Sequence, residues 1–287
     1  MSEFEALRLH AGPLTFSSLA AGVGPPVLLV HGFPDHARSW RLQLPALAEA
    51  GYRAVAPTLR GYEPSSQPAD GDYHIVRMAE DLGGEPVHLV GHDWGAVIAY
   101  VAAALAPDRL RSLTTLAIPH PGRLQSEGLR KLPSQILNSW YMLFFQLRGL
   151  ADFVVEARDW AFIEKLWRDW SPGWDLPAAE VQSVKQTLAQ PGVKKAALAY
   201  YRAMTDRRSD AAKETERLLS GPIPVRTLAL TGALDGCMDT RLHDLAISKD
   251  DFPAGVEVVR VENAGHFLHQ ERPEEVNRLL LDWLGRS

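Results

Sequence analysis

The sequence predicts one α/β domain: a mostly parallel sheet with helices on both faces and a helical cap inserted into it. Three observations predict this class. Short strand-like runs alternate with helical segments, as in folds built from parallel strands and crossover helices. The run "PPVLLV" at residues 25–30 is apolar throughout, which is typical of a strand covered on both faces. The alternation stops between about Pro121 and Pro222 and then resumes.

Each strand-like or helical run can be assigned to an element of the predicted domain. Residues 5–12 and 14–22 are expected to form a hairpin at one edge of the sheet. Further strands are expected at residues 25–32, 52–58, 86–92, 112–119, 224–232 and 256–265. Helices are expected at residues 37–51, 73–82 and 273–285, and directly after residue 93. Because helical segments separate these strands, the connections are crossovers and most of the strands run parallel.

The middle of the chain has a different character. Residues 121–221 lack strand-like runs and contain helical, aromatic-rich stretches such as "SQILNSWYMLFFQLRG". A length of 287 residues suits one large domain or one domain with an inserted subdomain. Since the strand pattern resumes afterwards, residues 1–120 and 222–287 are expected to form the core domain, with residues 121–221 as its cap.

The amino-acid composition limits the partners and the cellular location that this protein can be expected to have. Hydrophobic residues make up 46% of the chain and charged residues 23%, so a sizeable core is expected. The net charge of −5 argues against a nucleic acid or an anionic membrane as the main partner. The single cysteine, Cys237, excludes an internal disulfide. No signal peptide is evident, and the longest apolar run is too short to span a bilayer. We expect a cytoplasmic protein, with a homodimer left open.

The stretch "VHLVGHDWGAVIAYVAAALA", residues 87–106, carries the strongest chemical signal. A strand, a glycine-flanked turn and an alanine-rich helix form the pattern G-x-S-x-G, in which a sharp turn exposes a nucleophile. Here the central residue is Asp93 instead of serine. A carboxylate on such a turn suits attack on an sp³ carbon, because the resulting alkyl ester has its carbonyl on the enzyme, where water can attack it.

Two other strand ends supply possible partners for Asp93. Asp235 follows "VRTLAL" and His266 follows "VEVVRVE", and ligands of open parallel sheets bind beyond the carboxyl ends of the strands. Taken alone, Asp93 could be a helix N-cap and Asp235 part of a "LDG" turn. Their positions after the correct strands, in the order nucleophile, acid and histidine, favour a joint catalytic triad.

These motifs resemble those of the α/β-hydrolase superfamily over nearly the full chain, and specifically those of its epoxide hydrolases. The matching motifs are H-G-x-P at residues 31–34 and G-H-D-W-G at residues 91–95. Two cap tyrosines also match, Tyr141 in "WYMLFFQLRG" and Tyr201 in "LAYYRAM". Haloalkane dehalogenases share the second motif, so the tyrosine pair discriminates better. The stretch "LRGYEPSSQP" departs from the family's G-Y-G-x-S and is expected to alter the shape of that loop alone.

The resemblance implies hydrolysis of a small-molecule epoxide to a vicinal diol. Asp93 would form a covalent alkyl ester, and His266, oriented by Asp235, would activate the water that hydrolyses it. Backbone N–H groups of Phe33 and Trp94 would hold the oxyanion, and both residues are expected to contact the substrate. No cofactor and no metal are implied.

The tyrosines complete the expected chemistry. Tyr141 and Tyr201 would donate hydrogen bonds or a proton to the epoxide oxygen. Two assignments have rivals: Asp239 for the acid role of Asp235, and Tyr200 for the role of Tyr201.

Two other functions are weighed against epoxide hydrolysis. A haloalkane dehalogenase would use the same Asp93, His266 and Asp235, but it needs halide-binding donors, and Phe33 offers only its backbone. A non-catalytic receptor on the same fold would not need this complete set of groups.

Overall fold

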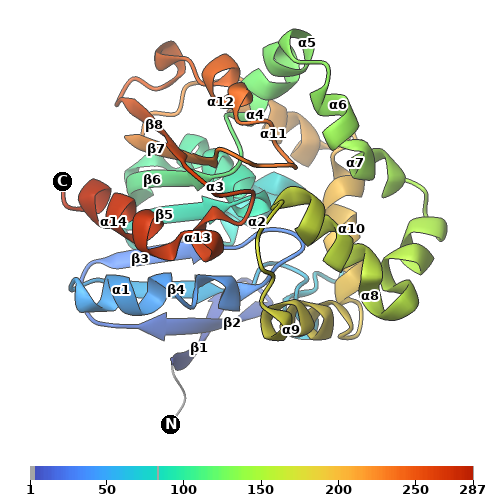
Figure 1. The fold of residues 1–287 in the computed structure, drawn as a ribbon. Helices are drawn as coiled ribbons and strands as arrows, with labels where there is room; N and C mark the ends of the chain where they lie inside the picture. The colour runs from blue at the N-terminus through green and yellow to red at the C-terminus, as the bar shows by residue number, and fades with distance from the viewer. Residues whose placement is uncertain (1–3, 83, 287) are drawn as a thin grey trace.

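A computed structural model describes residues 4–82 and 84–286, which form one eight-stranded sheet with helices around it (Figure 1). The strands lie in the order β1-β2-β4-β3-β5-β6-β7-β8. Only the pairs β1–β2 and β2–β4 are antiparallel, so the sheet is mostly parallel, as predicted. The strands are β1 Glu5–Ala11, β2 Leu14–Ala21, β3 Pro26–Val30, β4 Arg53–Pro57, β5 Val87–His92, β6 Leu110–Leu116, β7 Thr227–Gly232 and β8 Val256–Val261.

Helices cover both faces of the sheet, which explains why the central strand β3 is apolar throughout. On one face, Leu29 of β3 and Val90 of β5 share a core with α1 and α14. On the other, Leu89 of β5 packs in the core that includes α2, α3 and α11. These helices, with two short ones near the C-terminus, are α1 Gln43–Glu49, α2 Ile75–Glu80, α3 Trp94–Leu105, α11 Asp210–Leu219, α12 Arg241–Ala246, α13 Leu268–Glu271 and α14 Pro273–Leu284.

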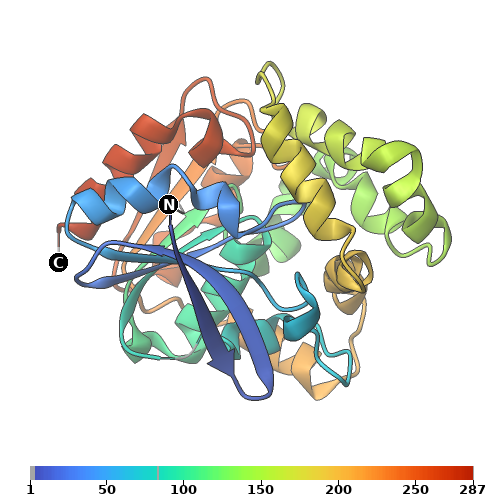
Figure 2. The same cartoon turned by 90° about the horizontal axis from the view of Figure 1, so that it is seen from below.

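The chain between β6 and β7 is helical, and β6 pairs directly with β7. Most of these helices lie together on one side of the sheet (Figures 1 and 2). The last helix, α11, instead packs against α2 and α3. The other members are α4 Pro121–Arg123, η4 Leu124–Gly128, α5 Leu129–Lys131, α6 Gln135–Asn138, α7 Trp140–Phe144, α8 Leu150–Trp170, α9 Ala178–Leu188 and α10 Val193–Ala203.

One predicted element differs in detail. The expected helix at residues 37–51 is a 3₁₀ turn, Ala37–Trp40, followed by α1. Pro45 explains the break, because its ring nitrogen has no hydrogen for the carbonyl of residue 41 and is tolerated only in the first turn of a helix. The expected edge hairpin is present, with β1 at the edge and β2 inside it, between β1 and β4. Among the described helices, none is both long enough and apolar enough to cross a membrane.

Candidate active site

Asp93 occupies the sharp turn between β5 and α3. Its backbone has φ 52° and ψ −118°, a conformation that side-chain-bearing residues rarely adopt, and its side chain is buried. The glycines on either side permit this turn. A Cβ on Gly91 would lie 2.2 Å from the carbonyl oxygen of Gly95, and one on Gly95 would lie 2.1 Å from that of Val30. The turn therefore needs glycine at both positions and holds the Asp93 carboxylate at the carboxyl end of the sheet.

Both oxygens of the Asp93 carboxylate have a neighbour. The backbone N–H of Phe33, in the loop after β3, donates to Oδ1 at 2.8 Å. The Nε2 atom of His266, in the loop after β8, lies 3.5 Å from Oδ2. Trp94 stands at the first position of α3, directly after the turn. Three strand ends thus converge on one buried carboxylate.

Asp235 is the carboxylate that contacts His266. Its Oδ2 atom lies 2.9 Å from Nδ1 of His266, and its Oδ1 atom accepts the backbone N–H groups of Cys237 and Met238, both at 2.8 Å. The rival Asp239 instead forms an ion pair with Arg241. The structure therefore brings Asp93, His266 and Asp235 together and leaves Asp239 outside this group.

The surroundings of His266 favour its charged form. Burial opposes protonation, but the adjoining carboxylates of Asp235 and Asp93 outweigh it and raise the pKa of His266 from 6.5 to about 10. At pH 7 the imidazole is therefore positively charged between two carboxylates.

Two tyrosines from the helical segment lie over this group. Tyr141 of α7 and Tyr201 of α10 are both buried, with ring centroids 5.8 Å apart. The Tyr141 hydroxyl lies 3.4 Å from the Cys237 sulfur, whereas the Tyr201 hydroxyl has no hydrogen-bond partner in the described part of the chain. The rival Tyr200 donates its hydroxyl to the carbonyl of Arg60 at 2.7 Å. Burial raises the pKa of Tyr141 and of Tyr201 well above the ordinary value, so both phenols are protonated at neutral pH.

Aromatic side chains connect these tyrosines to the turn. The Tyr201 ring packs edge-to-face against Trp94, with centroids 5.0 Å apart, and against Phe33 at 5.3 Å. Phe33 and Trp94 were predicted to contact the substrate, and both side chains are buried beside Asp93.

The backbone around His266 is fixed by contacts that sequence reasoning missed. Three consecutive backbone N–H groups donate hydrogen bonds. The N–H of Gly265 donates to the Glu271 carboxylate at 2.7 Å, and that of His266 donates to the Trp170 carbonyl at 3.0 Å. The N–H of Phe267 donates to the Ser171 hydroxyl at 3.3 Å. The Ser171 hydroxyl also donates to Glu271 at 2.6 Å. Trp170 and Ser171, at the end of α8, therefore fix the backbone of the loop that carries His266. We call this loop the histidine loop and these contacts its clamp. Ser171 lies 95 residues before His266, and no motif marks it.

The Trp170 carbonyl also joins the loop that carries His266 to the loop that carries Asp235. It accepts the N–H of Gly236, next to Asp235, at 3.0 Å. The Trp170 ring packs on the His266 imidazole, with centroids 5.0 Å apart, and on Tyr141, also at 5.0 Å. Trp170 of the helical segment thus contacts the loop that carries Asp235, the His266 ring and Tyr141.

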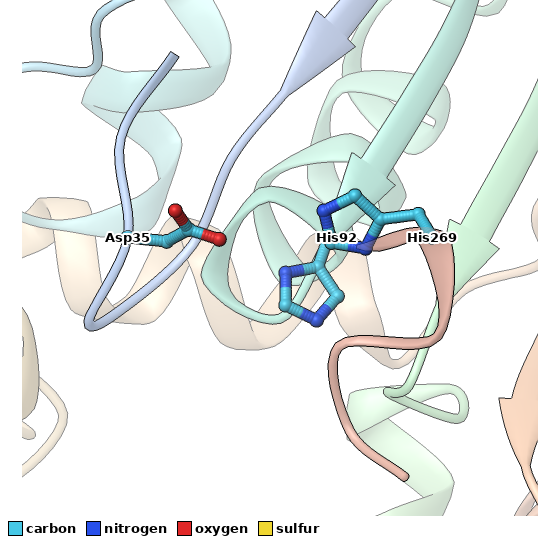
Figure 3. Close-up of side chains that lie close together, drawn as sticks. All are labelled: Asp35, His92 and His269. Carbon is cyan, nitrogen blue, oxygen red and sulfur yellow. The ribbon is translucent and has the colours of Figure 1, made fainter. Parts of the chain in front are cut away.

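A second buried cluster lies behind His266 and consists of Asp35, His92 and His269 (Figure 3). Nε2 of His92 lies 3.0 Å from the carbonyl oxygen of His266. Burial lowers the pKa of His92 to about 3 and raises that of Asp35 to about 8, so both are mainly neutral at pH 7. Burial also lowers the pKa of His269 well below its ordinary value. The cluster supports the histidine loop without adding charge beside it.

Two groups have the residue types that bind metals. One is this cluster and the other is Asp235, Cys237 and His266; in each, the potential ligand atoms lie within 4.8 Å of one another. In the second group, Asp235 and His266 already bind each other, and both Asp235 oxygens accept hydrogen bonds. A metal there would have to displace the contact that orients His266.

Comparison with known proteins shows which family has this architecture. Residues 25–273 match the family described as alpha/beta hydrolase fold. "Epoxide hydrolase 3" of Siraitia grosvenorii is 32% identical over an alignment of 323 positions, covering 100% of each chain. "Epoxide hydrolase A" of Mycobacterium tuberculosis is 32% identical, covering 91% of this chain and 90% of that relative. A solved epoxide hydrolase from an endophytic Streptomyces has a TM-score of 0.78 and 31% identity, covering 99% of this chain and 96% of its own. This chain therefore belongs to the α/β-hydrolase fold family and, within it, to the epoxide hydrolases.

Proposed function

We propose that this protein hydrolyses small-molecule epoxides to vicinal diols through a covalent ester on Asp93. The observation that carries the proposal is a carboxylate, instead of a hydroxyl, on the nucleophile turn beneath two buried phenols, those of Tyr141 and Tyr201. An epoxide needs both: a nucleophile for its sp³ carbon and an acid for its departing oxygen.

The first step is alkylation. One Asp93 oxygen bonds to an epoxide carbon, the carbon–oxygen bond of the ring breaks, and its electron pair stays on the oxygen. That alkoxide is strongly basic and takes a proton from Tyr141 or Tyr201, while the other phenol hydrogen-bonds to it. The Tyr201 hydroxyl supports this role, since the neighbouring indole of Trp94 can only donate a hydrogen bond and leaves the Tyr201 proton available.

The second step is hydrolysis of the ester. Alkylation removes the negative charge of Asp93, and with it one of the two carboxylates that raise the pKa of His266. The imidazolium can then lose its proton, which restores the phenol. Neutral His266 takes a proton from water as the water attacks the ester carbonyl, which gives a tetrahedral oxyanion. That intermediate then expels the ester oxygen of the diol, which takes the proton of the new carboxyl group, so the diol leaves and Asp93 is again a carboxylate beside protonated His266. The Phe33 N–H, already 2.8 Å from Oδ1 of Asp93, would stabilise the oxyanion together with the N–H of Trp94.

The remaining groups position these reactants. Asp235 would hold the His266 tautomer and stabilise its charged form, supported by its 2.9 Å contact with Nδ1. Residues 121–221 would act as the cap, because they supply both tyrosines and enclose the reacting groups. All five proposed catalytic side chains are at least nine-tenths buried, so exclusion of bulk water would strengthen the electrostatic interactions among them.

A single-turnover experiment in ¹⁸O-water tests the covalent route. With enzyme in excess over styrene oxide, the first diol should carry an oxygen from the protein, and the label should appear in the peptide that contains Asp93. A first-turnover diol that already carries solvent oxygen would mean direct attack by water. Incubation with a bromoalkane is the companion assay, in which rapid bromide release and slow diol formation would favour the dehalogenase instead.

A further inference from the structure

Cys237 links the acid Asp235 to the tyrosine Tyr141, and the proposed reaction gives it no role. Its side chain is buried, and its sulfur lies 3.4 Å from the Tyr141 hydroxyl oxygen. Within the described residues, this sulfur is the hydrogen-bond partner of that hydroxyl. The thiol therefore adjoins a phenol that is proposed to act on the substrate.

The backbone of Cys237 is fixed on both sides, so its sulfur has a defined position. Its N–H donates to Oδ1 of Asp235 at 2.8 Å, and its carbonyl oxygen accepts the side-chain amide of Gln135, in α6, at 2.8 Å. The Gln135 side chain also accepts the backbone N–H of Asp239 at 3.0 Å. The loop that carries Asp235 is therefore held against the helical segment that supplies Tyr141.

The sulfur lies among the groups that the proposed reaction uses. One nitrogen of His266, one carboxylate oxygen of Asp235 and the Cys237 sulfur all lie within 4.8 Å of one another. Nε2 of His266 is buried and makes no hydrogen bond within the described part of the chain. A change at the thiol is therefore made beside the reacting groups without removing any of them.

The thiol is protonated, so it does not act as a second nucleophile. Burial and the neighbouring carboxylates of Asp235 and Asp93 raise the pKa of Cys237 well above its ordinary value. The thiolate is the nucleophilic form of cysteine, and at neutral pH this sulfur keeps its proton. What remains available is a weak hydrogen-bond donor and a weak acceptor.

These properties suit a group that orients a phenol. The Tyr141 hydroxyl has a single proton, and a bound epoxide oxygen has to receive it or be hydrogen-bonded by it. Because sulfur is a weak acceptor, Cys237 does not compete strongly with the epoxide for that proton. When the phenol donates to the epoxide, its own oxygen can accept the S–H group. That hydrogen bond becomes charge-assisted, and so stronger, as the phenol gives up its proton.

We propose that Cys237 is a positioning residue whose thiol aims the Tyr141 hydroxyl at the epoxide oxygen and stabilises the charge that develops on Tyr141. This inference rests on the proposed function. The proton passes from the phenol to the alkoxide, and the thiol proton stays on sulfur, so the balance of the alkylation step is unchanged.

A double-mutant cycle tests this role, with ester formation from styrene oxide followed by rapid quench. Cys237→Ala should slow ester formation by about three- to tenfold, the range for loss of one hydrogen bond. In a Tyr141→Phe background the same substitution should change the rate by less than about twofold, because the hydroxyl on which the thiol acts is gone. Tyr201→Phe is the matched background, in which Cys237→Ala should keep its full effect.

Infrared spectroscopy tests the contact without turnover. Cys237 is the only cysteine of the chain, so the S–H stretching band of the protein reports this one thiol. The band should shift in Tyr141→Phe and stay in place in Tyr201→Phe. This measurement keeps the cysteine, so it remains informative if Cys237→Ala does not fold. Circular dichroism melting checks that each variant is folded.

Three outcomes would overturn the role of Cys237 alone. They are a folded Cys237→Ala protein that forms ester at the parent rate, a loss of rate that is equally large in the Tyr141→Phe background, and an S–H band that is the same in the parent and in Tyr141→Phe. A parent that forms no ester would overturn the proposed function, and this role with it.

Discussion

Nε2 of His266 lies 3.5 Å from Oδ2 of Asp93, slightly beyond an ordinary hydrogen bond, while Nδ1 of the same ring lies 2.9 Å from Asp235. The histidine is thus held by one carboxylate and faces the other. This asymmetry fits the proposed group that acts after Asp93 has reacted, since Nε2 makes no hydrogen bond within the described part of the chain and lies near the Asp93 carboxylate.

Replacing His266 with glutamine should separate the two proposed steps. Alkylation of Asp93 does not require the imidazole as a base, but hydrolysis of the ester does. The variant should therefore turn over at least 10³-fold more slowly and gain the mass of one substrate on the peptide containing Asp93. Intact-protein mass spectrometry checks this, with Asp93→Asn as the control that should gain no mass. An inactive His266→Gln protein that never gains mass would contradict the assignment.

The raised pKa of His266 predicts a pH-dependent stability. Because the folded pKa is about 10 and the ordinary value 6.5, protonation of His266 stabilises the fold fully below pH 6.5, and this stabilisation is lost as the pH rises towards 10. The difference in free energy of unfolding between the parent and His266→Gln should therefore shrink over that range. Urea unfolding at several pH values measures it. A difference that stays constant from pH 6 to pH 10 would show that folding does not raise the pKa of His266.

The two candidate acids should respond differently to the same substitution. Asp235→Asn places an amide against Nδ1 of His266, which disturbs the tautomer that presents Nε2 to the ester, so ester hydrolysis should slow by about 10³-fold or more. Asp239→Asn is the matched control, because its ion pair with Arg241 is on the surface and its loss should change the rate less than threefold. Rapid-quench measurement of ester decay compares them. The reverse ranking would transfer the acid role to Asp239.

The two tyrosines of the helical segment, Tyr141 and Tyr201, should control alkylation specifically. General acid assistance typically contributes about 10²–10⁴ in rate, and two donors share one oxygen, so Tyr141→Phe and Tyr201→Phe should each retain partial activity. The double variant should form no detectable ester. Tyr200→Phe, which loses only its bond to the Arg60 carbonyl, should alkylate at close to the parent rate. If the double variant still opened epoxides at the parent rate, epoxide hydrolysis would lose its main support over halide displacement, because a halide leaves without a proton.

The clamp on the histidine loop should affect hydrolysis more than alkylation. Ser171→Ala leaves the Phe267 N–H and one Glu271 oxygen without their partner, which should cost about 1–3 kcal/mol of stability. If the clamp positions His266, ester decay should also slow by about tenfold, while ester formation stays within twofold. Stopped-flow tryptophan fluorescence follows both steps. A loss of stability with both rates unchanged would limit Ser171 to a structural role. Ser126→Ala, which removes an exposed hydroxyl that bonds within its own helical turn, is the control.

Much of the candidate site could be predicted from the sequence, because short motifs of neighbouring residues mark it. The glycines around Asp93 are adjacent in sequence, and the close approach of Gly91, Gly95 and Val30 explains why this turn tolerates no larger residue there. The strand pattern also predicted that loops after β5, β7 and β8 would meet, since parallel strands bring their carboxyl ends to one edge. The positions of Asp93, Asp235 and His266 follow from these two facts.

The contacts that distinguish the rival residues depend on the tertiary structure. Asp235 and Asp239 are both close to the end of β7, and Tyr200 and Tyr201 are adjacent, so sequence spacing could only rank them. The turn at Asp235 directs its Oδ2 to His266. The helical rotation between neighbouring residues aims the Tyr200 hydroxyl at the Arg60 carbonyl and places the Tyr201 ring against Phe33 and Tyr141. A side chain's direction depends on backbone angles and packing, which composition does not specify.

The sequence by itself determined the fold class, the insertion of a helical segment and the carboxylate on the turn, because periodicity and turn chemistry are properties of neighbouring residues. Only the tertiary structure decided that Trp170 and Ser171 hold the loop that carries His266. Those contacts join residues almost a hundred positions apart. Burial and long-range hydrogen bonding are set by the whole chain, so no local pattern reports them.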